Sequence, residues 1–375
     1  MLSLVVALTL VAAPADFIDD VRPLFRLVTC QGDLPASLDA KTAEAWCVVQ
    51  DKRYTQYREN WGPRAREFLN PLKPAALPPE LVYPFGGGDL MSALQLFPEA
   101  QVFTTLSLEL AGDPRRWKKI TDAKSLKTSL AALSNASAST LMSNDSLSRN
   151  LSATQRGELP GQLSMHLMGL AIAGQEPVSV RFFRVEPDGA LHYYSQEEID
   201  ALEGSTAKKL KDTWRAPDFS PAFANVEVQF VPKGQLDAPR RTHRHLAANL
   251  GDEAVPVGVM KHLESKGRVT AMTKAASYLL WRNTFSKVRD WLVASSAFMV
   301  FDSTGVPPRY WLKQGCAVAA YGQFEKSFLG TWEGYQVELR ELFATAKKVP
   351  MRFGYPDGSE RKHNHLMTAT CPEKK

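Results

Sequence analysis

Apolar and polar positions are patterned most clearly over residues 81–109, where they predict a strand, a glycine loop, a helix and a second strand. A short apolar run ends at Phe85, which is typical of a strand buried on both faces. Three glycines follow, and Asp89 then stands where a helix N-cap belongs. Apolar residues recur at helical spacing from Leu90, and a further apolar run closes on Glu109. The pattern therefore predicts a βαβ unit.

The chain before this unit has a helical pattern. Apolar residues on one face predict a helix near residues 17–28, and a second helix is expected at residues 39–57. A proline-rich connector, residues 71–79, leads into the βαβ unit. Residues 16–79 are therefore expected to form an N-terminal helical cap with its connector.

Residues 80–375 are expected to form the main α/β domain, with a Ser/Asn-rich excursion at residues 121–154. Two hairpins are predicted from alternating strands around Pro-Asp-Gly and Pro-Lys-Gly turns, at residues 178–195 and 226–250. Further elements are expected as follows: a helix at 162–173, two consecutive helices at 274–297, strands at 298–301 and 316–321, a helix at 335–346 and a closing hairpin at 351–371. The fold class is α/β, a Rossmann-like mixed sheet with an N-terminal helical cap and added β-hairpins.

Composition and the first fifteen residues indicate where the protein is located. A chain of 375 residues with a formal charge of +5 and dispersed Lys and Arg carries no nucleic-acid footprint. Residues 1–15 resemble a signal peptide, because a short apolar core precedes the A-x-A site that ends at Ala15. Cleavage before Asp16 is expected, and no apolar run is long enough for a membrane span. The sequence predicts a periplasmic or extracellular protein.

Four cysteines fit an exported protein, and they permit three disulfide connectivities. Cys30 with Cys47 and Cys316 with Cys371 is the favoured pairing, because the first pair closes a short local loop. Four buried free thiols are the alternative. The cysteines form no CxxC motif, so they give no support to a zinc site.

The glycine loop is the first candidate site, and its residues are Gly86, Gly87, Gly88 and Asp89. An acid about 20 residues beyond a glycine turn, here Glu109, is where dinucleotide folds hold a ribose hydroxyl. Nucleotide-type methyltransferases show a similar strand, glycine loop, helix and acid. The sequence GGGD departs from GxGxxG, so a tight turn followed by an ordinary strand-end acid is the structural alternative.

The second candidate is the segment DSTGVPPRYW, residues 302–311, which follows a predicted buried strand. Asp302, Ser303 and Thr304 offer an acid and two hydroxyls where open α/β sheets place ligand contacts. Arg309 adds an anion-binding group beside two aromatic residues. We expect this loop to share one crevice with the glycine loop if their strands are neighbours. A rigid turn capped by Asp302 is the alternative.

Two H-x-H pairs, His243/His245 and His363/His365, place both rings on one face if each pair lies in a strand. Neighbouring Arg and Lys residues disfavour a cation, so no metal site is assigned. His166 lies on the apolar face of a predicted helix and is expected to be a core histidine. Serine hydrolase and zinc protease motifs are missing from the sequence.

Three stretches together resemble a family of exported bacterial proteins without an assigned activity. They are YPFGGGDLMSALQLFPEA, KAASYLLWRNTFSKVRDWL and FDSTGVPPRYW, and the resemblance spans about residues 81–355. It implies export and a single architecture, and it brings no catalytic residue with it.

Three functions remain open at this point. The leading hypothesis is a non-catalytic exported protein that binds a small polar or anionic ligand at the two loops. The second is an active transferase with a methyltransferase-like core, or a hydrolase, that uses the same crevice. The third is a structural envelope protein whose loops are only tight turns. The sequence names no cofactor.

Overall fold

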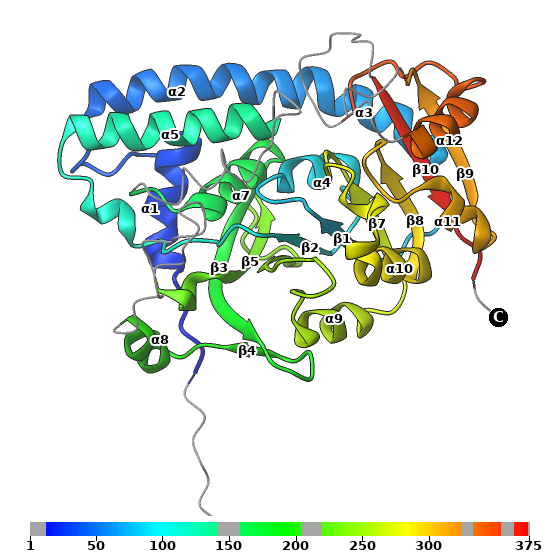
Figure 1. The fold of residues 1–375 in the computed structure, drawn as a ribbon. Helices are drawn as coiled ribbons and strands as arrows, with labels where there is room; N and C mark the ends of the chain where they lie inside the picture. Colours follow the sequence, from blue (N-terminus) through cyan, green and yellow to red (C-terminus); the bar gives the residue numbers. More distant parts are fainter. Residues whose placement is uncertain (1–12, 142–157, 204–219, 325–332, 354–363, 374–375) are drawn as a thin grey trace, which may run out of the picture.

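A ten-stranded mixed sheet runs through the computed structural model, which describes residues 13–141, 158–203, 220–324, 333–353 and 364–373 (Figure 1). Across the sheet the strands follow the order β4-β3-β5-β6-β2-β1-β7-β8-β10-β9. Their bounds are β1 Glu80–Pro84, β2 Val102–Ser107, β3 Gln175–Val185, β4 Leu191–Tyr193, β5 Asn225–Pro232, β6 Arg241–Ala247, β7 Val269–Thr273, β8 Ser296–Phe301, β9 Ala317–Gly322 and β10 His365–Thr370.

The centre of the sheet is parallel. β1 pairs in parallel with β2 on one side and with β7 on the other, β2 pairs with β6, and β7 pairs with β8. Leu81 and Tyr83 of β1 pack into one apolar layer and Val82 into the other, so the strand is buried on both faces. Helix α4, Leu90–Leu96, joins β1 to β2. The predicted βαβ unit is therefore confirmed.

Antiparallel strands extend the sheet at both ends. The predicted hairpins are present as β3 with β4 and β5 with β6. The predicted closing hairpin is wrong, because residues 351–353 form no strand and β10 instead lies between β8 and β9. The Asn364 side chain explains the difference, since it bonds to the backbone groups of Met351 and Phe353 that a strand ladder would have used.

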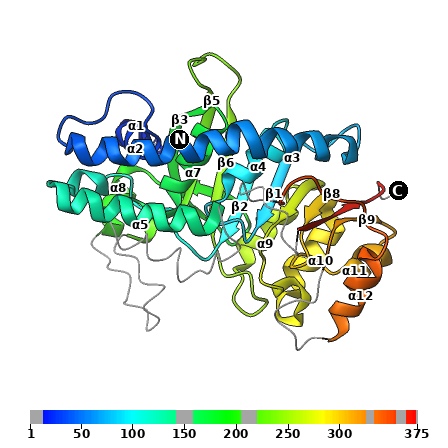
Figure 2. The same cartoon turned by 90° about the horizontal axis from the view of Figure 1, so that it is seen from above.

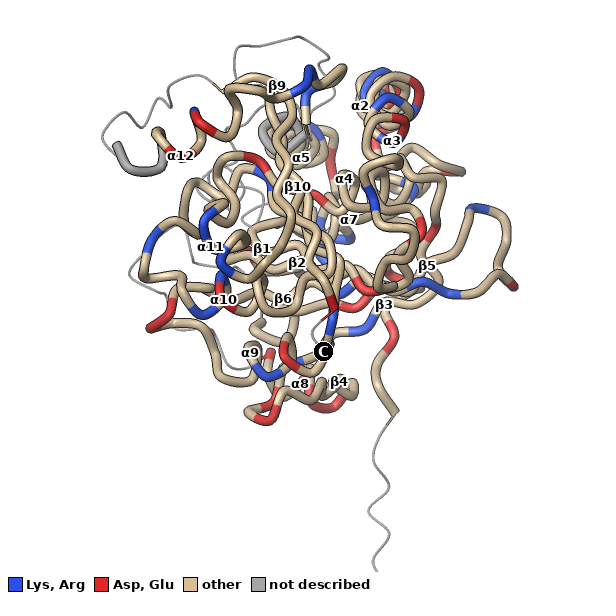
Figure 3. Tube along the Cα trace, turned by 90° about the vertical axis from the view of Figure 1, so that its right-hand side faces the viewer, with Lys and Arg blue, Asp and Glu red and all other residues tan. Residues whose placement is uncertain are grey.

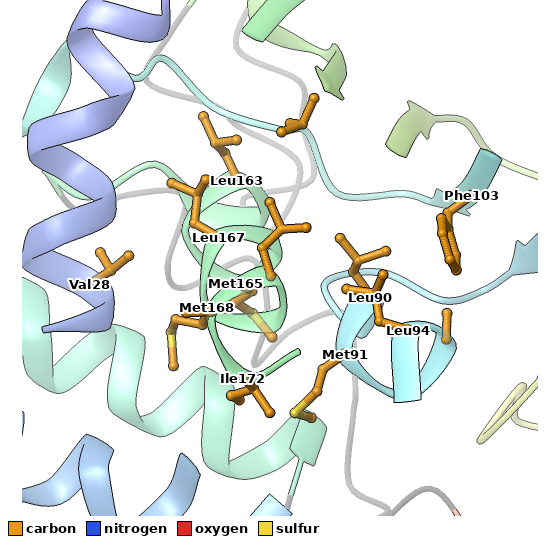
Figure 4. Packing of buried hydrophobic residues seen from close by; sticks show 14 of the residues in the cluster. Val28, Leu90, Met91, Leu94, Phe103, Leu163, Met165, Leu167, Met168 and Ile172 are labelled. Atoms are coloured by element: carbon orange, nitrogen blue, oxygen red, sulfur yellow. The ribbon is translucent and has the colours of Figure 1, made fainter. Parts of the chain in front are cut away.

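One face of the sheet is covered by the N-terminal helices and by the helices between β2 and β3. They are α1 Ile18–Thr29, α2 Ala40–Thr55, a π-helix Gln56–Trp61, α3 Gly62–Leu69, α5 Ala123–Leu141 and α7 Gly161–Ile172. Helices α2 and α5 lie side by side (Figure 2), and Arg53 bonds to Ser134 and Ser137 across them. Helix α7 is buried at every position, and its Leu163, Met165 and Leu167 lie between α1 and α4 (Figure 4).

The other face carries α9 Val257–Glu264, α10 Ser286–Ser295, α11 Pro308–Lys313 and α12 Glu333–Phe343. The two helices predicted for residues 274–297 are only partly present. A left-handed turn at Ala275, Ser277 and Tyr278 replaces the first helix, and α10 is the second. Helix α8, Gln196–Glu203, begins with a capping box: the Ser195 N–H donates to Glu198 Oε2, and the Glu198 N–H donates to Ser195 Oγ.

Both predicted disulfides are present. Cys30, at the end of α1, bonds to Cys47 of α2 and fastens these helices together. Cys316 and Cys371 join the start of β9 to the end of β10, which are neighbours in the sheet.

Charged residues of both signs are mixed over the described trace (Figure 3). In the parts of the chain that the structure describes, no helix has the length and apolar character needed to cross a bilayer.

Candidate functional site

A cavity of about 130 Å³ lies where β1, β2, β6 and β7 end. The residues that follow each of these strands line it, including Gly86 after β1, Glu109 after β2, Asn249 after β6 and Lys274 after β7. Strand order reverses here, because the chain moves from β1 to β2 and β6 on one side and to β7 and β8 on the other. In open α/β sheets, ligands bind outside the carboxyl ends of the strands at such a reversal.

The glycine loop forms one wall of the cavity. Gly86 passes close over the Tyr83 ring, since a Cβ at Gly86 would lie 2.7 Å from the ring carbon Cγ. Gly87 has a φ of +49°, which favours glycine. Gly88 has a packing role, because a Cβ there would lie 2.7 Å from the Met165 methyl carbon of α7. Gly86 and Gly87 therefore face the cavity, and Gly88 allows α7 to approach the loop.

Asp89 connects the helix start to the cavity. Its Oδ1 accepts the backbone N–H of Ser92, which confirms the predicted N-cap of α4. Its Oδ2 accepts the Tyr83 hydroxyl at 3.0 Å and pairs with Lys274 Nζ at 2.6 Å. The side chains of Asp89 and Lys274 are 2% and 4% exposed. A buried pair of this kind is tolerated because each charge has an opposite charge and hydrogen bonds.

The segment after β7 is held in an unusual conformation. Ala275, Ser277 and Tyr278 have φ values between +52° and +57°, and Phe85 across the cavity has +60°. Left-handed conformations of residues other than glycine store strain and gather at ligand sites. Of the five such residues in the described chain, the fifth is Cys30, which ends α1. Backbone strain is therefore concentrated around this cavity.

Asp302, Ser303 and Thr304 hold that strained segment in place. Asp302 Oδ2 accepts the N–H of Ala275 at 2.9 Å, and Thr304 Oγ1 accepts the N–H of Ala276 at 2.6 Å. The Ser303 hydroxyl bonds to the Tyr278 hydroxyl at 3.0 Å.

These residues follow β8, which β7 separates from β1, and they lie outside the lining of the cavity. Arg309 also lies outside it. Its guanidinium is about half exposed, pairs with Glu338 at 2.7 Å and stacks over Trp281 and Tyr310. The predicted second loop is therefore adjacent to the cavity. It does not line the cavity but fixes the segment after β7 that does.

Glu109 brings a carboxylate to the cavity, and the described residues provide no hydrogen-bond donor for its oxygen Oε1. The residue is 5% exposed, and its Oε1 is buried and accepts no hydrogen bond from the described residues. Its backbone is fixed, since its N–H bonds to Ser107 Oγ and its carbonyl accepts His245 Nε2 at 2.7 Å. A buried acceptor left unpaired costs on the order of 1–3 kcal/mol. Glu109 Oε1 is therefore the atom in the cavity best suited to accept a hydrogen bond from a ligand.

Three buried histidines contact the backbone of the glycine loop and of Glu109. His166 of α7 packs against His243 and His245 of β6, with ring centroids 4.4 and 5.0 Å apart. Thr105 Oγ1 joins His243 Nε2 at 2.9 Å to His245 Nδ1 at 3.1 Å. His166 Nε2 bonds to the Gly87 carbonyl at 3.1 Å.

One assignment of protons satisfies these bonds. Each ring carries its proton on Nε2, which donates to Thr105, to the Glu109 carbonyl or to the Gly87 carbonyl. Burial lowers the pKa of His245 to about 4 and lowers the pKa of His166 and of His243 well below the usual value. The neutral cluster thus holds the backbone of the glycine loop and of Glu109.

The predicted strand placement of His243 and His245 on one buried face is confirmed, and so is the core position of His166. His363 lies outside the described residues, and His365 of β10 accepts a bond from the Ser303 N–H. No group of three or more His, Cys, Asp or Glu side chains in the described ranges is arranged to hold a metal ion.

Sequence patterns did not identify Lys274 as a site residue. They placed it at the start of the two helices predicted for residues 274–297, whereas it follows β7 and is buried against Asp89. The missed signal is the apolar run of residues 269–273 between Gly267 and Lys274, which forms β7. A lysine directly after a buried parallel strand stands at the ligand edge of the sheet.

Comparisons with protein-family models, with curated proteins and with solved structures found no match to this chain.

Proposed function

We propose that this chain is an exported protein that binds a small polar ligand in the cavity at the ends of β1, β2, β6 and β7. The observation that carries the proposal is the buried Glu109 carboxylate, whose Oε1 has no partner among the described residues. The fixed Asp89–Lys274 pair and the strained segment beside it support the proposal, because preorganised groups and stored strain are features of ligand sites.

The size of the cavity favours a small ligand. Sites for drug-sized ligands measure roughly 300–1,000 Å³. The cavity here measures about 130 Å³ and accommodates a compact molecule with a single ring or a short chain. A whole dinucleotide needs more room than this.

A transferase with a nucleoside-type cofactor is the second candidate, and one observation favours it. The reversal of strand order at β1 and β7, the glycine loop and the acid after β2 meet at one cavity, as in a Rossmann-like or methyltransferase-like core. This candidate requires the cavity to open beyond its present volume. Because its cofactor would be of the nucleoside type, this candidate predicts binding of adenosine or S-adenosylmethionine.

Export is supported by the two disulfides, because such bonds persist in oxidising compartments. The predicted signal sequence falls almost entirely on residues 1–12, outside the described part of the chain. Intact-mass analysis of the secreted protein tests both points: the expected mature chain starts at Asp16 and carries no free thiol.

Ligand-observed NMR tests the binding proposal directly. The wild-type protein is screened against small amines, polyols, carboxylates, adenosine and S-adenosylmethionine. Leu108 lines the cavity at its exposed edge, so Leu108→Trp should block binding, whereas the exposed Leu236 lies outside the lining and Leu236→Trp should not. A compound that binds the wild type and Leu236→Trp but not Leu108→Trp supports the proposal. Binding of none of these compounds would favour a structural role.

A further inference from the structure

The charge in the cavity is unbalanced. Among the residues that line it, Asp89 and Glu109 are acidic and Lys274 is basic. Lys274 already pairs with Asp89 at 2.6 Å, within a network that includes Tyr83 and Ser92. Glu109 therefore remains as a buried acid for which the described residues provide no ion pair and no donor to Oε1.

A buried charge of this kind is stabilised most by an opposite charge. A neutral hydroxyl satisfies the hydrogen bond but leaves the carboxylate charge uncompensated. An ammonium group supplies three N–H donors and a positive charge together. An anionic ligand would add a second like charge beside Glu109, which is unfavourable at short range.

The remaining walls fit an organic cation with an apolar body. The rings of Phe85 and Phe285 lie 6.0 Å apart in an edge-to-face pair, and Leu108 and Leu279 complete an apolar side. Aromatic faces attract cations as well as apolar groups. A cavity of roughly 150 Å³ accepts benzene. The volume of about 130 Å³ therefore limits the ligand to one ring or a chain of similar size.

We propose that the cavity selects a small organic ammonium ion, with Glu109 as the residue that determines the charge of the ligand. This inference rests on the proposed binding function and narrows the ligand from any small polar molecule to one chemical class. Gly86 and Gly87 line the cavity without side chains, and the Asp89–Lys274 pair is neutral overall toward the ligand.

Three probes of nearly equal shape test the inference: benzylamine, benzyl alcohol and benzoate. Isothermal titration calorimetry at pH 7 on the full secreted protein should give the tightest binding for benzylamine. Its affinity should exceed that of benzyl alcohol by at least about fivefold, since a charged hydrogen bond exceeds a neutral one by about 1 kcal/mol or more. Glu109→Gln keeps the size of the side chain and should remove this preference.

Glu253→Gln is the matched control, because Glu253 is exposed and lies outside the lining of the cavity. It should keep the preference for benzylamine. Circular dichroism and thermal melting confirm that both variants are folded before the titrations are compared.

Benzyl alcohol or benzoate binding as tightly as benzylamine, or a preference that survives Glu109→Gln, would overturn the inference. If a polyol or carboxylate from the NMR screen binds in a manner blocked by Leu108→Trp while benzylamine does not, the binding function stands and the ammonium inference is wrong. If no screened compound binds, both fail.

Discussion

At the scale of single residues, two buried acids in the same cavity have opposite surroundings. Asp89 is neutralised by Lys274 and bonded by Tyr83 and Ser92, so it fixes the local structure. Glu109 has fixed backbone bonds, but its buried Oε1 has no protein donor in the described chain. We therefore assign a structural role to the first acid and a ligand-contacting role to the second.

Removal of the Lys274 charge should be costly. Lys274→Met leaves Asp89 buried without its counter-ion, which is expected to lower the free energy of unfolding by about 3–5 kcal/mol. Urea unfolding measures this change. Arg309→Met is the control, because its pair with Glu338 is partly exposed and should contribute no more than about 1 kcal/mol. Equal losses in the two variants would contradict the assignment.

Protonation of the histidine cluster should destabilise the fold. The pKa of His245 is about 4 in the folded chain and near 6.5 when unfolded, so between these values the unfolded chain binds the extra proton. The stabilisation is complete above about pH 6.5 and is lost as the pH falls to about 4, at a cost of about 3 kcal/mol for this residue. His166 and His243 extend the loss to lower pH.

NMR of the histidine ring nitrogens tests this prediction at single residues. At pH 5.5 the His245 ring should be neutral with its proton on Nε2, where it bonds to the Glu109 carbonyl. Urea unfolding between pH 7 and 4.5 should show falling stability. A charged His245 ring at pH 5.5 in the folded protein would contradict the account.

At the scale of elements, the site consists of four strand ends and a supporting loop. Asp302 accepts bonds from the N–H groups of Ala275 and Thr304 and from the Thr304 hydroxyl, and it thereby fixes the segment that carries Lys274. The loop after β8 thus acts on the cavity through β7, without lining it.

Truncation of Asp302 should loosen that segment. Asp302→Ala removes the acceptor for three hydrogen bonds, and we expect a loss of about 1–3 kcal/mol in the free energy of unfolding. Hydrogen exchange should become faster at residues 275–278. Asp290→Ala, at an exposed acid of α10, should leave this exchange unchanged. Unchanged exchange in Asp302→Ala as well would remove the supporting role.

Sequence patterns predicted the elements whose signals are local. The apolar run before Gly86, the N-cap Asp89 and the helical spacing of α4 lie within a few residues of each other, so β1, α4 and β2 were predicted correctly. The segment after Thr273 was assigned to a helix because its apolar spacing is helical. Its actual turn depends on hydrogen bonds that its N–H groups donate to Asp302 and Thr304, almost thirty residues away, which no local pattern contains.

The difference between local and distant signals also decides which site residues were predicted. Gly86, Gly87, Asp89 and Glu109 were found from one contiguous stretch, and they line the cavity together. Lys274 was missed because its partner is distant in sequence. That no described residue donates a hydrogen bond to Glu109 Oε1 is likewise a property of packing, so the sequence identified the acid but not this missing partner.

At the scale of the whole molecule, the two disulfides fasten parts that the sheet leaves at its periphery. Cys30–Cys47 joins two helices on one face, and Cys316–Cys371 joins the last two strands. In both cases the cysteines lie away from the cavity lining. Their contribution is expected to be to stability, with no direct part in binding.

Removal of either disulfide should therefore lower the stability of the fold and leave ligand affinity nearly unchanged. The loops closed span 17 and 55 residues, so the chain-entropy model gives about 3 kcal/mol for Cys30–Cys47 and about 4 kcal/mol for Cys316–Cys371. Each disulfide is removed by replacing both of its cysteines with serine. Thermal unfolding should show the larger loss of stability for the variant that lacks Cys316–Cys371. Ligand affinity of the folded variants should stay within about twofold of the wild type, a margin below about 0.5 kcal/mol.

The most direct test of the proposed binding site is a titration followed by two-dimensional NMR of the backbone amides. Addition of benzylamine, or of any compound retained in the screen, should shift the amides of Gly86, Gly87, Glu109 and Lys274. Those amides follow three different strands around one cavity, so we expect them to respond together. Shifts confined to another surface, such as the groove beside Met260 and Trp291 between α9 and α10, would contradict the claim that this cavity is the binding site.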